Sequence, residues 1–211
     1  MSKSAGIILN GAALTVVPQD DYIICADGGM KFAQNLKVDL VLGDFDSSDY
    51  NDAPNGSKTL RYKIEKDATD GELAILHALT CGYRKINIYA ALGGRVDHIL
   101  GNLALLSIAH GMNATATIID SEQTIFLTTS KSCVHLPCGS FLSLIPFGGN
   151  AIVSDGINLK YPLDNLHLTP HSTLGISNVA TSNYIEFSVV SGKVIVVVNA
   201  PNTTITITSS K

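Results

Sequence analysis

The residues best suited to chemistry in this chain are aspartates, and most of them lie in its first half. Aspartate outnumbers glutamate by 14 to 4, and nine of the aspartates lie between Asp27 and Asp97. Glutamate is the better helix former, whereas the shorter carboxylate is favoured in caps, turns and metal sites. The surplus therefore predicts loops, helix caps or metal ligands along this stretch.

Asp44 and Asp46 lie two residues apart, in the sequence Gly43-Asp-Phe-Asp-Ser47. In an extended chain, residues two apart face the same way, so the two carboxylates would point together and Phe45 toward the core. At about 4 Å they repel by roughly 4 kcal/mol at an effective dielectric near 20. Folding tolerates this if one is protonated or a cation lies between them. The alternative is a solvated turn in which the two side chains splay apart.

The segment Lys66–Glu72 contributes two further acids. Thr69 and Glu72 have the spacing of a capping box, which predicts a helix that starts here. Asp70 would lie in the first turn, where an acid favours the helix dipole, so it has a purely structural explanation. Asp67 has none, because Thr69 already caps the helix, and Lys66 could neutralise these acids or contact a phosphate.

Two glycine-rich segments complete the set. Asp27-Gly28-Gly29 follows an apolar run and precedes a helical one, which suits phosphate at a helix start but also an ordinary turn and N-cap. Gly93-Gly-Arg-Val-Asp-His98 brings Arg95 and Asp97 to another expected helix start, where they could cradle polyphosphate. Asp97 could equally be the N-cap, and His98 a capping or core-facing residue.

Carboxylate oxygens without histidine or cysteine suit Mg²⁺, which also bridges to substrate phosphates. The sequence contains no G-x-x-x-x-G-K-[ST] loop and no G-x-G-x-x-G fingerprint, nor a kinase catalytic loop or a nucleophile elbow. Any phosphate chemistry would therefore be organised by acids and metal.

The elements that must position these residues alternate between strands and helices up to about Ile119. The expected strands are Gly6–Leu9, Tyr22–Ala26, Asp39–Leu42, Ile86–Ala90 and Thr115–Ile119, and the expected helices are Met30–Leu36, Asp70–Thr80 and His98–Ala109. In the second helix Leu73, Leu76 and Leu79 would form the buried face, and Gly82 and Gly111 suit the C′ positions of the last two helices. This alternation predicts an α/β N-terminal domain with a mainly parallel sheet, covered on both faces.

The second half of the sequence shows no helical period, and this pattern indicates an all-β sandwich or barrel domain. Short runs rich in Val, Ile and Thr lie between turns, and we expect strands at Phe141–Ile145, Ala151–Val153, Tyr184–Val190, Val194–Val198 and Thr203–Thr208. The chain is therefore divided into domains 1–122 and 123–211, with a boundary near Glu122–Lys131.

Composition narrows the class of protein. The net charge of −4 and the absence of basic runs argue against a nucleic-acid partner. Mean hydropathy is +0.25, yet the apolar stretch from Ala5 to Val17 is too short for a membrane span and lacks the features of a signal peptide. Four cysteines without metal-site spacing suit reduced thiols, with Cys25 in the core. We expect a cytoplasmic protein without membrane contact.

Taken in order, the motifs resemble the thiamine pyrophosphokinase family. They are Asn10-Gly11, Ala26-Asp-Gly-Gly29, Gly43-Asp-Phe-Asp-Ser47, Lys66-Asp-Ala-Thr-Asp70, Gly93-Gly-Arg-Val-Asp-His98, Leu100-Gly-Asn-Leu103, Gly156-Ile-Asn-Leu-Lys-Tyr161 and Gly175-Ile-Ser-Asn178. The resemblance spans nearly the whole chain. The order and spacing of three of these motifs, those that begin at Gly43, Lys66 and Gly93, are specific to the family.

The resemblance implies transfer of the pyrophosphoryl group of ATP to the hydroxyl of thiamine, with release of AMP. It implies an α/β catalytic domain that binds ATP and Mg²⁺, a β-sandwich for thiamine and dimerisation, and a homodimer with shared active sites. The implied metal ligands are Asp44, Asp46, Asp67 and Asp70. The implied catalytic residues are Asp46, Asp67, Asp70 and Arg95, with Asp70 orienting or deprotonating the hydroxyl. ATP would contact Asp27, Gly28, Asp44, Lys66 and Asp97, and thiamine would contact Ser177 and Asn178.

The chain departs from the family pattern in two places. Val38 stands where a proline often precedes the acid at Asp39, and the tryptophan that some relatives place near thiamine is missing, because the chain has none. Asn183, Tyr184 or Tyr161 could cover that surface.

Two other functions use the same residues. A metal-dependent nucleotide phosphohydrolase would direct water instead of thiamine at ATP. A non-catalytic binding module would use the acids in calcium-stabilised loops, although the D-x-[DN]-x-[DN]-G signature is missing.

Overall fold

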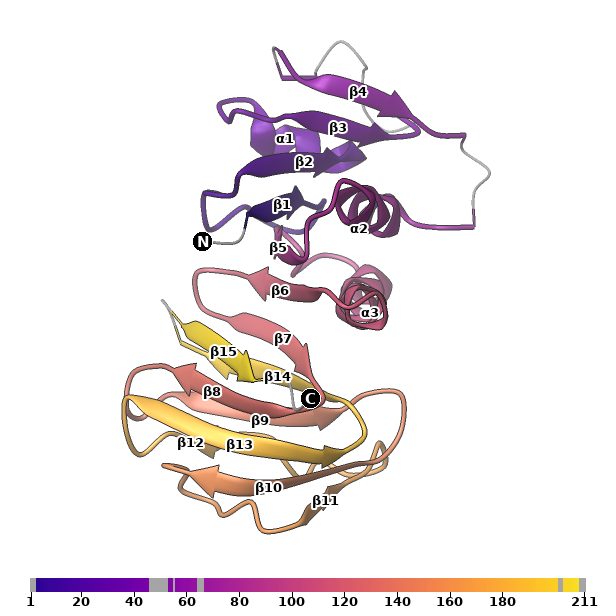
Figure 1. The fold of residues 1–211 in the computed structure, drawn as a ribbon. Coiled ribbons are helices and arrows are strands. Elements are labelled where there is room, and N and C mark those ends of the chain that lie inside the picture. Colours follow the sequence, from indigo (N-terminus) through magenta and orange to yellow (C-terminus); the bar gives the residue numbers. More distant parts are fainter. Residues whose placement is uncertain (1–2, 46–52, 55, 64–66, 201–202, 209–211) are drawn as a thin grey trace. The chain divides into compact units, whose positions relative to one another are not determined.

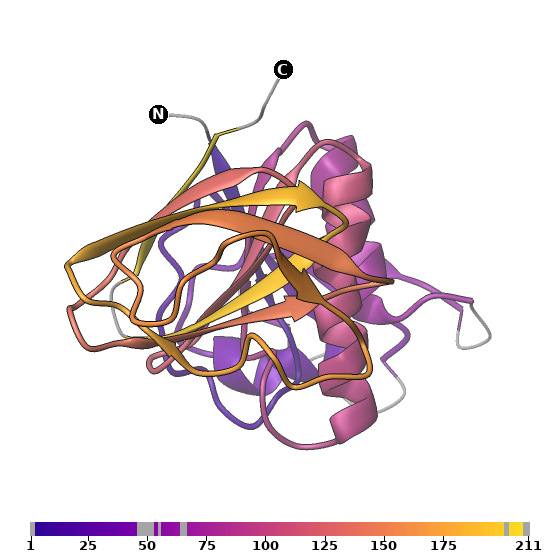
Figure 2. The ribbon, with the colours of Figure 1, turned by 90° about the horizontal axis from the view of Figure 1, so that it is seen from below.

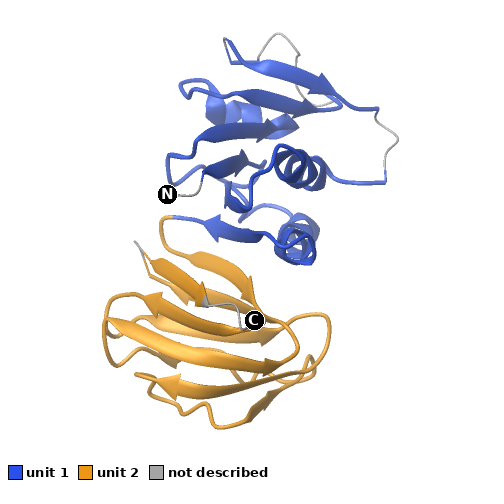
Figure 3. Ribbon diagram, in the orientation of Figure 1, with its two compact units in different colours: residues 1–120 blue, residues 121–211 orange. Residues whose placement is uncertain are grey.

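The computed structural model describes residues 3–45, 53–54, 56–63, 67–200 and 203–208. The chain forms two compact units, residues 1–120 and 121–211 (Figure 3). Each unit has its own hydrophobic interior and is considered separately below.

The first unit is built on parallel strands. These are β1 (Ser4–Ile8), β2 (Tyr22–Ala26), β3 (Leu40–Gly43), β4 (Lys58–Arg61), β5 (Lys85–Tyr89) and β6 (Thr115–Ile119). Within the described residues they lie in the order β6-β5-β1-β2-β3-β4, and every neighbouring pair is parallel (Figure 1). Parallel pairing is what the strand–helix alternation predicts. The order reverses between β1 and β5, and such reversals are where open α/β sheets bind ligands.

Helices cover this sheet. A short 3-10 turn, η1 (Asp27–Gly29), leads into α1 (Met30–Ala33), which is shorter than the expected Met30–Leu36. Met30 and Ala33 pack with Ile8, Cys25 and Val41 in one buried cluster. The alternate strand residues Ile7, Ile24 and Leu42 are also fully buried, on the opposite face, because successive strand side chains point to opposite sides.

The longer helices α2 (Asp70–Thr80) and α3 (Val96–Gly111) lie side by side (Figures 1 and 2). In α2 the buried residues are Gly71, Ala74, Ile75, Ala78 and Leu79. The expected face of three leucines is therefore wrong in part, because Leu73 and Leu76 are only half-buried. Gly71, Ala74 and Ala78 make three of the five buried positions small, with Ile75 and Leu79 between them.

The ends of the helices show which capping predictions hold. The backbone N–H of Glu72 donates to Thr69 Oγ1 at 3.2 Å, so the predicted cap is confirmed. Gly82 has φ +90°, and the bonds from Gly82 N to Leu79 O and from Tyr83 N to Ala78 O complete a Schellman motif. The C′ role predicted for Gly111 is wrong. The helix runs through Gly111, and Asn113, at φ +56°, takes that role because asparagine tolerates the left-handed region.

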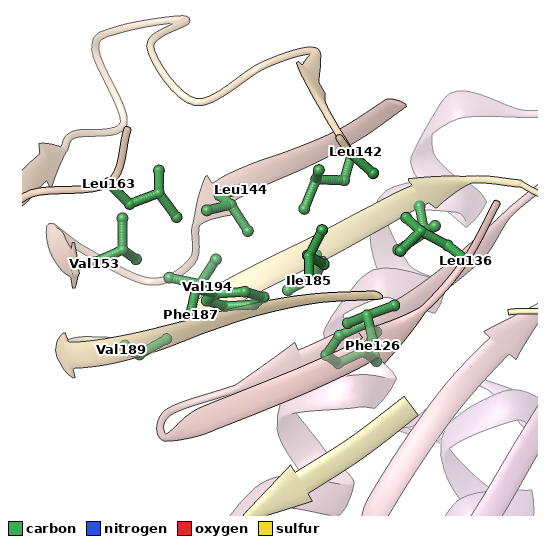
Figure 4. Close-up of a cluster of buried hydrophobic side chains, with 14 of the residues drawn as sticks. Phe126, Leu136, Leu142, Leu144, Val153, Leu163, Ile185, Phe187, Val189 and Val194 are labelled. Atoms are coloured by element: carbon green, nitrogen blue, oxygen red, sulfur yellow. The ribbon is translucent and has the colours of Figure 1, made fainter. Parts of the chain in front are cut away.

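The second unit consists of antiparallel strands. They are β7 (Thr124–Thr128), β8 (Lys131–His135), β9 (Phe141–Pro146), β10 (Ala151–Ile157), β11 (Leu166–Leu168), β12 (Asn178–Val179), β13 (Tyr184–Ser191), β14 (Val194–Asn199) and β15 (Thr204–Thr208). One group has the order β12-β9-β14-β7 and the other β11-β10-β13-β8-β15. Their inward side chains share one core, with Phe126 and Phe187 as its largest members (Figure 4).

Five strands of the structure were not expected from the sequence, namely β4, β7, β8, β11 and β12. β7 and β8 lie in or beside the expected boundary near Glu122–Lys131, yet β7 is buried throughout and pairs with β14. Strands β4, β11 and β12 are only two to four residues long. Short segments of this kind carry too few alternations to reveal a period.

The four cysteines are all free thiols. Cys25 is fully buried, as predicted, and burial raises the pKa of its thiol to about 12. Along the described ranges, no helix is both long and apolar enough to cross a membrane.

The two helix-end glycines give a matched pair of substitutions. Gly82→Ala should destabilise the protein by about 1 kcal/mol, because alanine is strained at a left-handed φ while its Cβ would meet nothing within 4 Å. Gly111→Ala should stabilise it by up to about 1 kcal/mol, because alanine is the better helix former and the site is equally open. Urea unfolding checks both values, and destabilisation by Gly111→Ala would contradict the assignment of Asn113 as C′.

Candidate active site

Asp27 stands directly after β2, at the carboxyl end of the parallel sheet, and opens η1. Its φ of +23° is rare for a residue with a side chain, although aspartate tolerates positive φ better than most. The residue is buried, with only 7% of its surface exposed. The chain therefore reverses at this point and keeps a carboxylate inside, which is costly unless the carboxylate has partners.

Asp44 follows the neighbouring strand β3, which pairs with β2 in parallel register. A Cβ on Gly43 would lie 2.6 Å from the Cβ of Asp27, so only glycine lets the ends of the two strands come this close. Phe45 is buried, as predicted, but its φ of +58° is not extended. The extended chain on which the prediction for Asp44 and Asp46 relied is therefore absent at Phe45, and Asp46 itself lies outside the described residues.

Asp70 is the first residue of α2 and comes from a third element. Asp27, Asp44 and Asp70 each offer a carboxylate oxygen, and these oxygens lie within 4.8 Å of one another. In the portion of the chain that the structure describes, this is the one group of three or more acidic, histidine or cysteine side chains placed to hold a metal ion. The start of α2 adds its positive dipole end beside the three acids.

The donor set fits Mg²⁺. Ligands about 2.1 Å from an octahedral ion are about 3 to 4.2 Å apart, close to the limit set by the three aspartates. All three donors are hard oxygens, and carboxylates at such spacing repel one another by several kcal/mol in the absence of a cation.

The structure places the other predicted ligands differently. Asp46 and Lys66 lie outside the described residues. Asp67 is exposed and does not belong to the group of three. The predicted metal roles of Asp46 and Asp67 therefore stay predictions. Asp27, which the resemblance assigned to ATP, joins the carboxylate cluster. Its place directly after the expected strand Tyr22–Ala26 was the one signal for this in the sequence.

Loops at the reversal of strand order lie beside this cluster. Gly11 N donates to Ala90 O at 2.7 Å, and Ala12 N donates to Leu92 O at 2.9 Å, so the loops after β1 and β5 are tied together. A Cβ on Gly28 would lie 2.3 Å from Asn10 Nδ2, which explains the glycine after Asp27. The motifs Asn10-Gly11 and Asp27-Gly28 thus pack directly on each other.

Arg95 and Asp97 form a solvent-exposed ion pair. Arg95 Nη2 donates to Asp97 Oδ2 at 2.6 Å and Nε donates to Oδ1 at 3.1 Å. This hydrogen bonding, together with the His98 N–H, lowers the pKa of Asp97 to about 2. Asp97 is not the N-cap, because α3 begins at Val96 and Arg95 precedes it. His98 is exposed, so it does not face the core.

The residues assigned to thiamine lie in the second unit and differ in exposure. Ser177 is exposed, with φ +60°, and its backbone N–H donates to Ser143 Oγ at 3.1 Å. Asn178 is buried, and its side chain bonds to the backbone of Tyr161. Only the first of the two side chains is open to a ligand.

A parallel sheet with clustered carboxylates at its carboxyl end is typical of Mg²⁺-dependent enzymes that act on phosphate substrates. Comparison with known proteins is more specific. A family model described as "Thiamin pyrophosphokinase, catalytic domain" matches residues 14–118, and one described as "Thiamin pyrophosphokinase, vitamin B1 binding domain" matches residues 122–194. The chain belongs to the thiamine pyrophosphokinase family.

Individual relatives agree with this assignment. Thiamine pyrophosphokinase of Bacillus subtilis is 34% identical over 163 residues, which cover 74% of this chain and 76% of the relative. A crystal structure of the enzyme from Bacillus subtilis superposes with a TM-score of 0.81 at 29% identity, covering 94% of this chain and 99% of that one. The structure from Geobacillus thermodenitrificans, at 24% identity and a TM-score of 0.78, covers 94% and 98% and shows the same fold.

The metal assignment predicts a difference in thermal stability. Mg²⁺ should raise the Tm of the wild-type protein, because an ion that binds only the folded state stabilises it. Asp27→Asn should abolish most of that increase while leaving the Tm in chelator unchanged or higher, since repulsion is relieved. Asp164→Asn, at an exposed site in the second unit, serves as the control. An equal Mg²⁺-dependent increase in Tm in the Asp27 variant would contradict the assignment.

The ion pair predicts a titration. In Arg95→Gln the pKa of Asp97 should rise from about 2 toward the ordinary aspartate value near 3.9. The lowered pKa means that the pair favours the folded state above about pH 4 and loses this effect as the pH falls toward 2. Carboxyl-carbon NMR titration of wild type and variant measures the shift, and identical pKa values would show that Arg95 does not engage Asp97 in solution.

Proposed function

We propose that this chain transfers the pyrophosphoryl group of ATP to the hydroxyl of thiamine, giving thiamine diphosphate and AMP. The observation that carries the proposal is the cluster of Asp27, Asp44 and Asp70 at the carboxyl end of the sheet, in a chain whose two halves match the two domains of the family. The cluster would hold the metal ion that binds the polyphosphate, and membership of the family indicates that thiamine is the acceptor.

The main contribution of the protein to this reaction is to position the two substrates. The thiamine hydroxyl oxygen forms a bond to the β-phosphorus of ATP, and the bond from that phosphorus to the oxygen bridging the α-phosphate breaks. The hydroxyl proton leaves to a carboxylate, for which Asp70 is our choice, and AMP departs with the bridging oxygen. Such transfers are accelerated chiefly by orientation and by stabilisation of charge on the phosphates.

Mg²⁺ would be held by Asp27, Asp44 and Asp70, and when bound it supplies neutralisation of the triphosphate charge. Asp46 and Asp67 belong to the same proposal from their sequence positions. Gly28 and the start of η1 would let the nucleotide approach the backbone. Arg95, Asp97 and Lys66 would bind the nucleotide or offset charge on the departing AMP.

We further propose that residues 1–122 form the catalytic domain and residues 123–211 bind thiamine and form the dimer interface. Ser177 would contact the thiamine pyrimidine. The working protein would be a cytoplasmic homodimer with active sites shared between subunits. The exposed apolar residues Phe141, Leu174 and Ile176 of the second unit support this, because apolar side chains of this size are often covered by a ligand or a partner.

The phosphohydrolase alternative finds no support in the comparisons, which name thiamine pyrophosphokinases among both sequence relatives and solved structures. The non-catalytic calcium module predicts no turnover at all. Each alternative therefore differs from the proposal in what it does with ATP.

One assay tests the proposal. Protein incubated with ATP, Mg²⁺ and thiamine should form AMP and thiamine diphosphate in equal amounts, and omission of thiamine should abolish AMP formation. Asp44→Asn and Asp70→Asn should fold normally and lose turnover by about a hundredfold or more, since each removes charge from the cluster. Asp164→Asn should be unchanged. AMP or phosphate release without thiamine would support hydrolysis instead, and normal rates in both cluster variants would reject the site.

A further inference from the structure

A sulfur and an oxygen face the same imidazole nitrogen where α2 ends, at the opposite end of this helix from Asp70. His77 lies in the last turn and Cys81 is the C-cap, so the two residues are four positions apart and lie on one face of the helix. Cys81 Sγ lies 3.5 Å from His77 Nε2. The hydroxyl oxygen of Tyr22, the first residue of β2, lies 3.4 Å from the same nitrogen.

These three side chains are open to solvent and held in place by stacking. Cys81 is an exposed free thiol, and Tyr22 and His77 are partly exposed. The ring of Tyr22 stacks on that of His77, with centroids 6.3 Å apart and planes at 21°, and on that of Tyr83 at 5.4 Å and 8°. The stack therefore fixes the imidazole while its Nε2 stays beside an accessible thiol.

The contacts assign the protonation state of His77. The Tyr22 hydroxyl and the Cys81 thiol both carry a hydrogen, so an Nε2 that accepts is compatible with both contacts, and the ring proton is then on Nδ1. Burial lowers the pKa of His77, which keeps the imidazole neutral. A neutral imidazole with a free lone pair on Nε2 is the form that binds metal ions.

The distances match the edges of a metal coordination tetrahedron. Zn²⁺ binds cysteine sulfur at about 2.3 Å and histidine nitrogen or an oxygen at about 2.0 to 2.1 Å. Tetrahedral angles then place sulfur and nitrogen about 3.5 Å apart, and nitrogen and oxygen about 3.3 Å apart. The corresponding distances here are 3.5 and 3.4 Å. The second is long for a hydroxyl hydrogen bond, which is usually about 2.8 Å.

The surrounding charges favour a cation. Burial raises the pKa of Tyr83, and the negative charges of Asp21 and Asp39 raise it further, so both acids act on this cluster. The guanidinium of Arg84 also lies at this end of α2, where it donates to the carbonyl oxygens of Leu79 and Tyr83. Two acids against one guanidinium leave a negative local charge, which suits a divalent ion.

A second pair of the same residue types provides an internal comparison. On β8, Cys133 Sγ and His135 Nε2 are 3.9 Å apart, which is wider than the tetrahedral edge. Lys131 lies two residues before Cys133 on the same face of the strand, and its positive charge opposes a bound cation. The pair on α2 is therefore the better placed of the two for metal binding.

We propose that Cys81, His77 and Tyr22 form a second metal site, which takes a borderline-soft divalent cation of the Zn²⁺ class. Cys81 supplies a thiolate, His77 its Nε2 and Tyr22 its phenol oxygen, and water completes the tetrahedron. The thiol proton passes to solvent when the ion binds. Mg²⁺ does not compete, because it prefers sites made of oxygen ligands.

The sequence analysis found no metal-site spacing around the cysteines for a structural reason. A histidine and a cysteine four residues apart come together only when the segment between them is helical. The third donor comes from β2, more than fifty positions earlier in the chain.

Co²⁺ tests the site directly, because a thiolate bound to Co²⁺ gives a charge-transfer band in the near ultraviolet. Excess Mg²⁺ is included to fill sites made only of oxygen. Reduced wild-type protein should develop the band with one Co²⁺ per chain, and added Zn²⁺ should abolish it. Cys81→Ser should show no band, whereas Cys133→Ser, the matched control, should behave like wild type. No band in wild type, or a full band in Cys81→Ser, would overturn the proposal.

The other two donors are tested by affinity for Co²⁺. Loss of even an outer-shell partner weakens metal binding by about 10- to 100-fold, so His77→Gln and Tyr22→Phe should each weaken it by at least about tenfold. Tyr22→Phe keeps the stacked ring and removes only the phenol oxygen, and His135→Gln is the matched control for His77→Gln. The Tm in chelator shows that each variant is folded. An affinity equal to that of wild type in either variant would overturn the three-donor site.

Discussion

Asp27, Asp44 and Asp70 each place a carboxylate oxygen within 4.8 Å of the other two, so the three side chains repel one another strongly. The fold of the first unit holds them together despite this repulsion. Asp27 and Asp44 follow neighbouring parallel strands, and Gly43 removes the side chain that would keep them apart. Asp70 is brought in by α2, whose start is fixed by the Thr69 cap. Parallel strands end at the same edge, so the sheet itself delivers the acids to one place.

Two carboxylates about 4 Å apart repel each other by roughly 4 kcal/mol at an effective dielectric near 20. The helix dipole at the start of α2 favours nearby acids by up to about 1 kcal/mol. A divalent cation placed among the three carboxylates attracts all of them, so the arrangement that is repulsive without the ion favours metal binding. The left-handed conformation of Asp27 points the same way, because strained residues of this kind concentrate at functional sites.

Sequence reasoning reached some of this and missed the rest for physical reasons. The strands Tyr22–Ala26 and Thr115–Ile119 and the helix Asp70–Thr80 were predicted to the residue, because apolar runs and a capping box are local signals. The membership of Asp27 in the cluster depends on its φ and on β2–β3 pairing, neither of which is local. The side-chain alternation expected around Phe45 required an extended chain, and the positive φ of Phe45 breaks that extended pattern.

In the second unit, β7 is a strand because it pairs with β14, about seventy residues later in the chain. The burial of Asn178 likewise depends on a partner, Tyr161, seventeen positions away.

The most direct test of the carboxylate centre is the position of the metal. Crystals of the protein grown with Mn²⁺ and a non-hydrolysable ATP analogue would locate the ion by its anomalous scattering. The account predicts a peak in direct contact with oxygens of Asp27, Asp44 and Asp70, with the nucleotide phosphates on its open side. A fully occupied ion bound to the nucleotide but touching none of these three aspartates would contradict it.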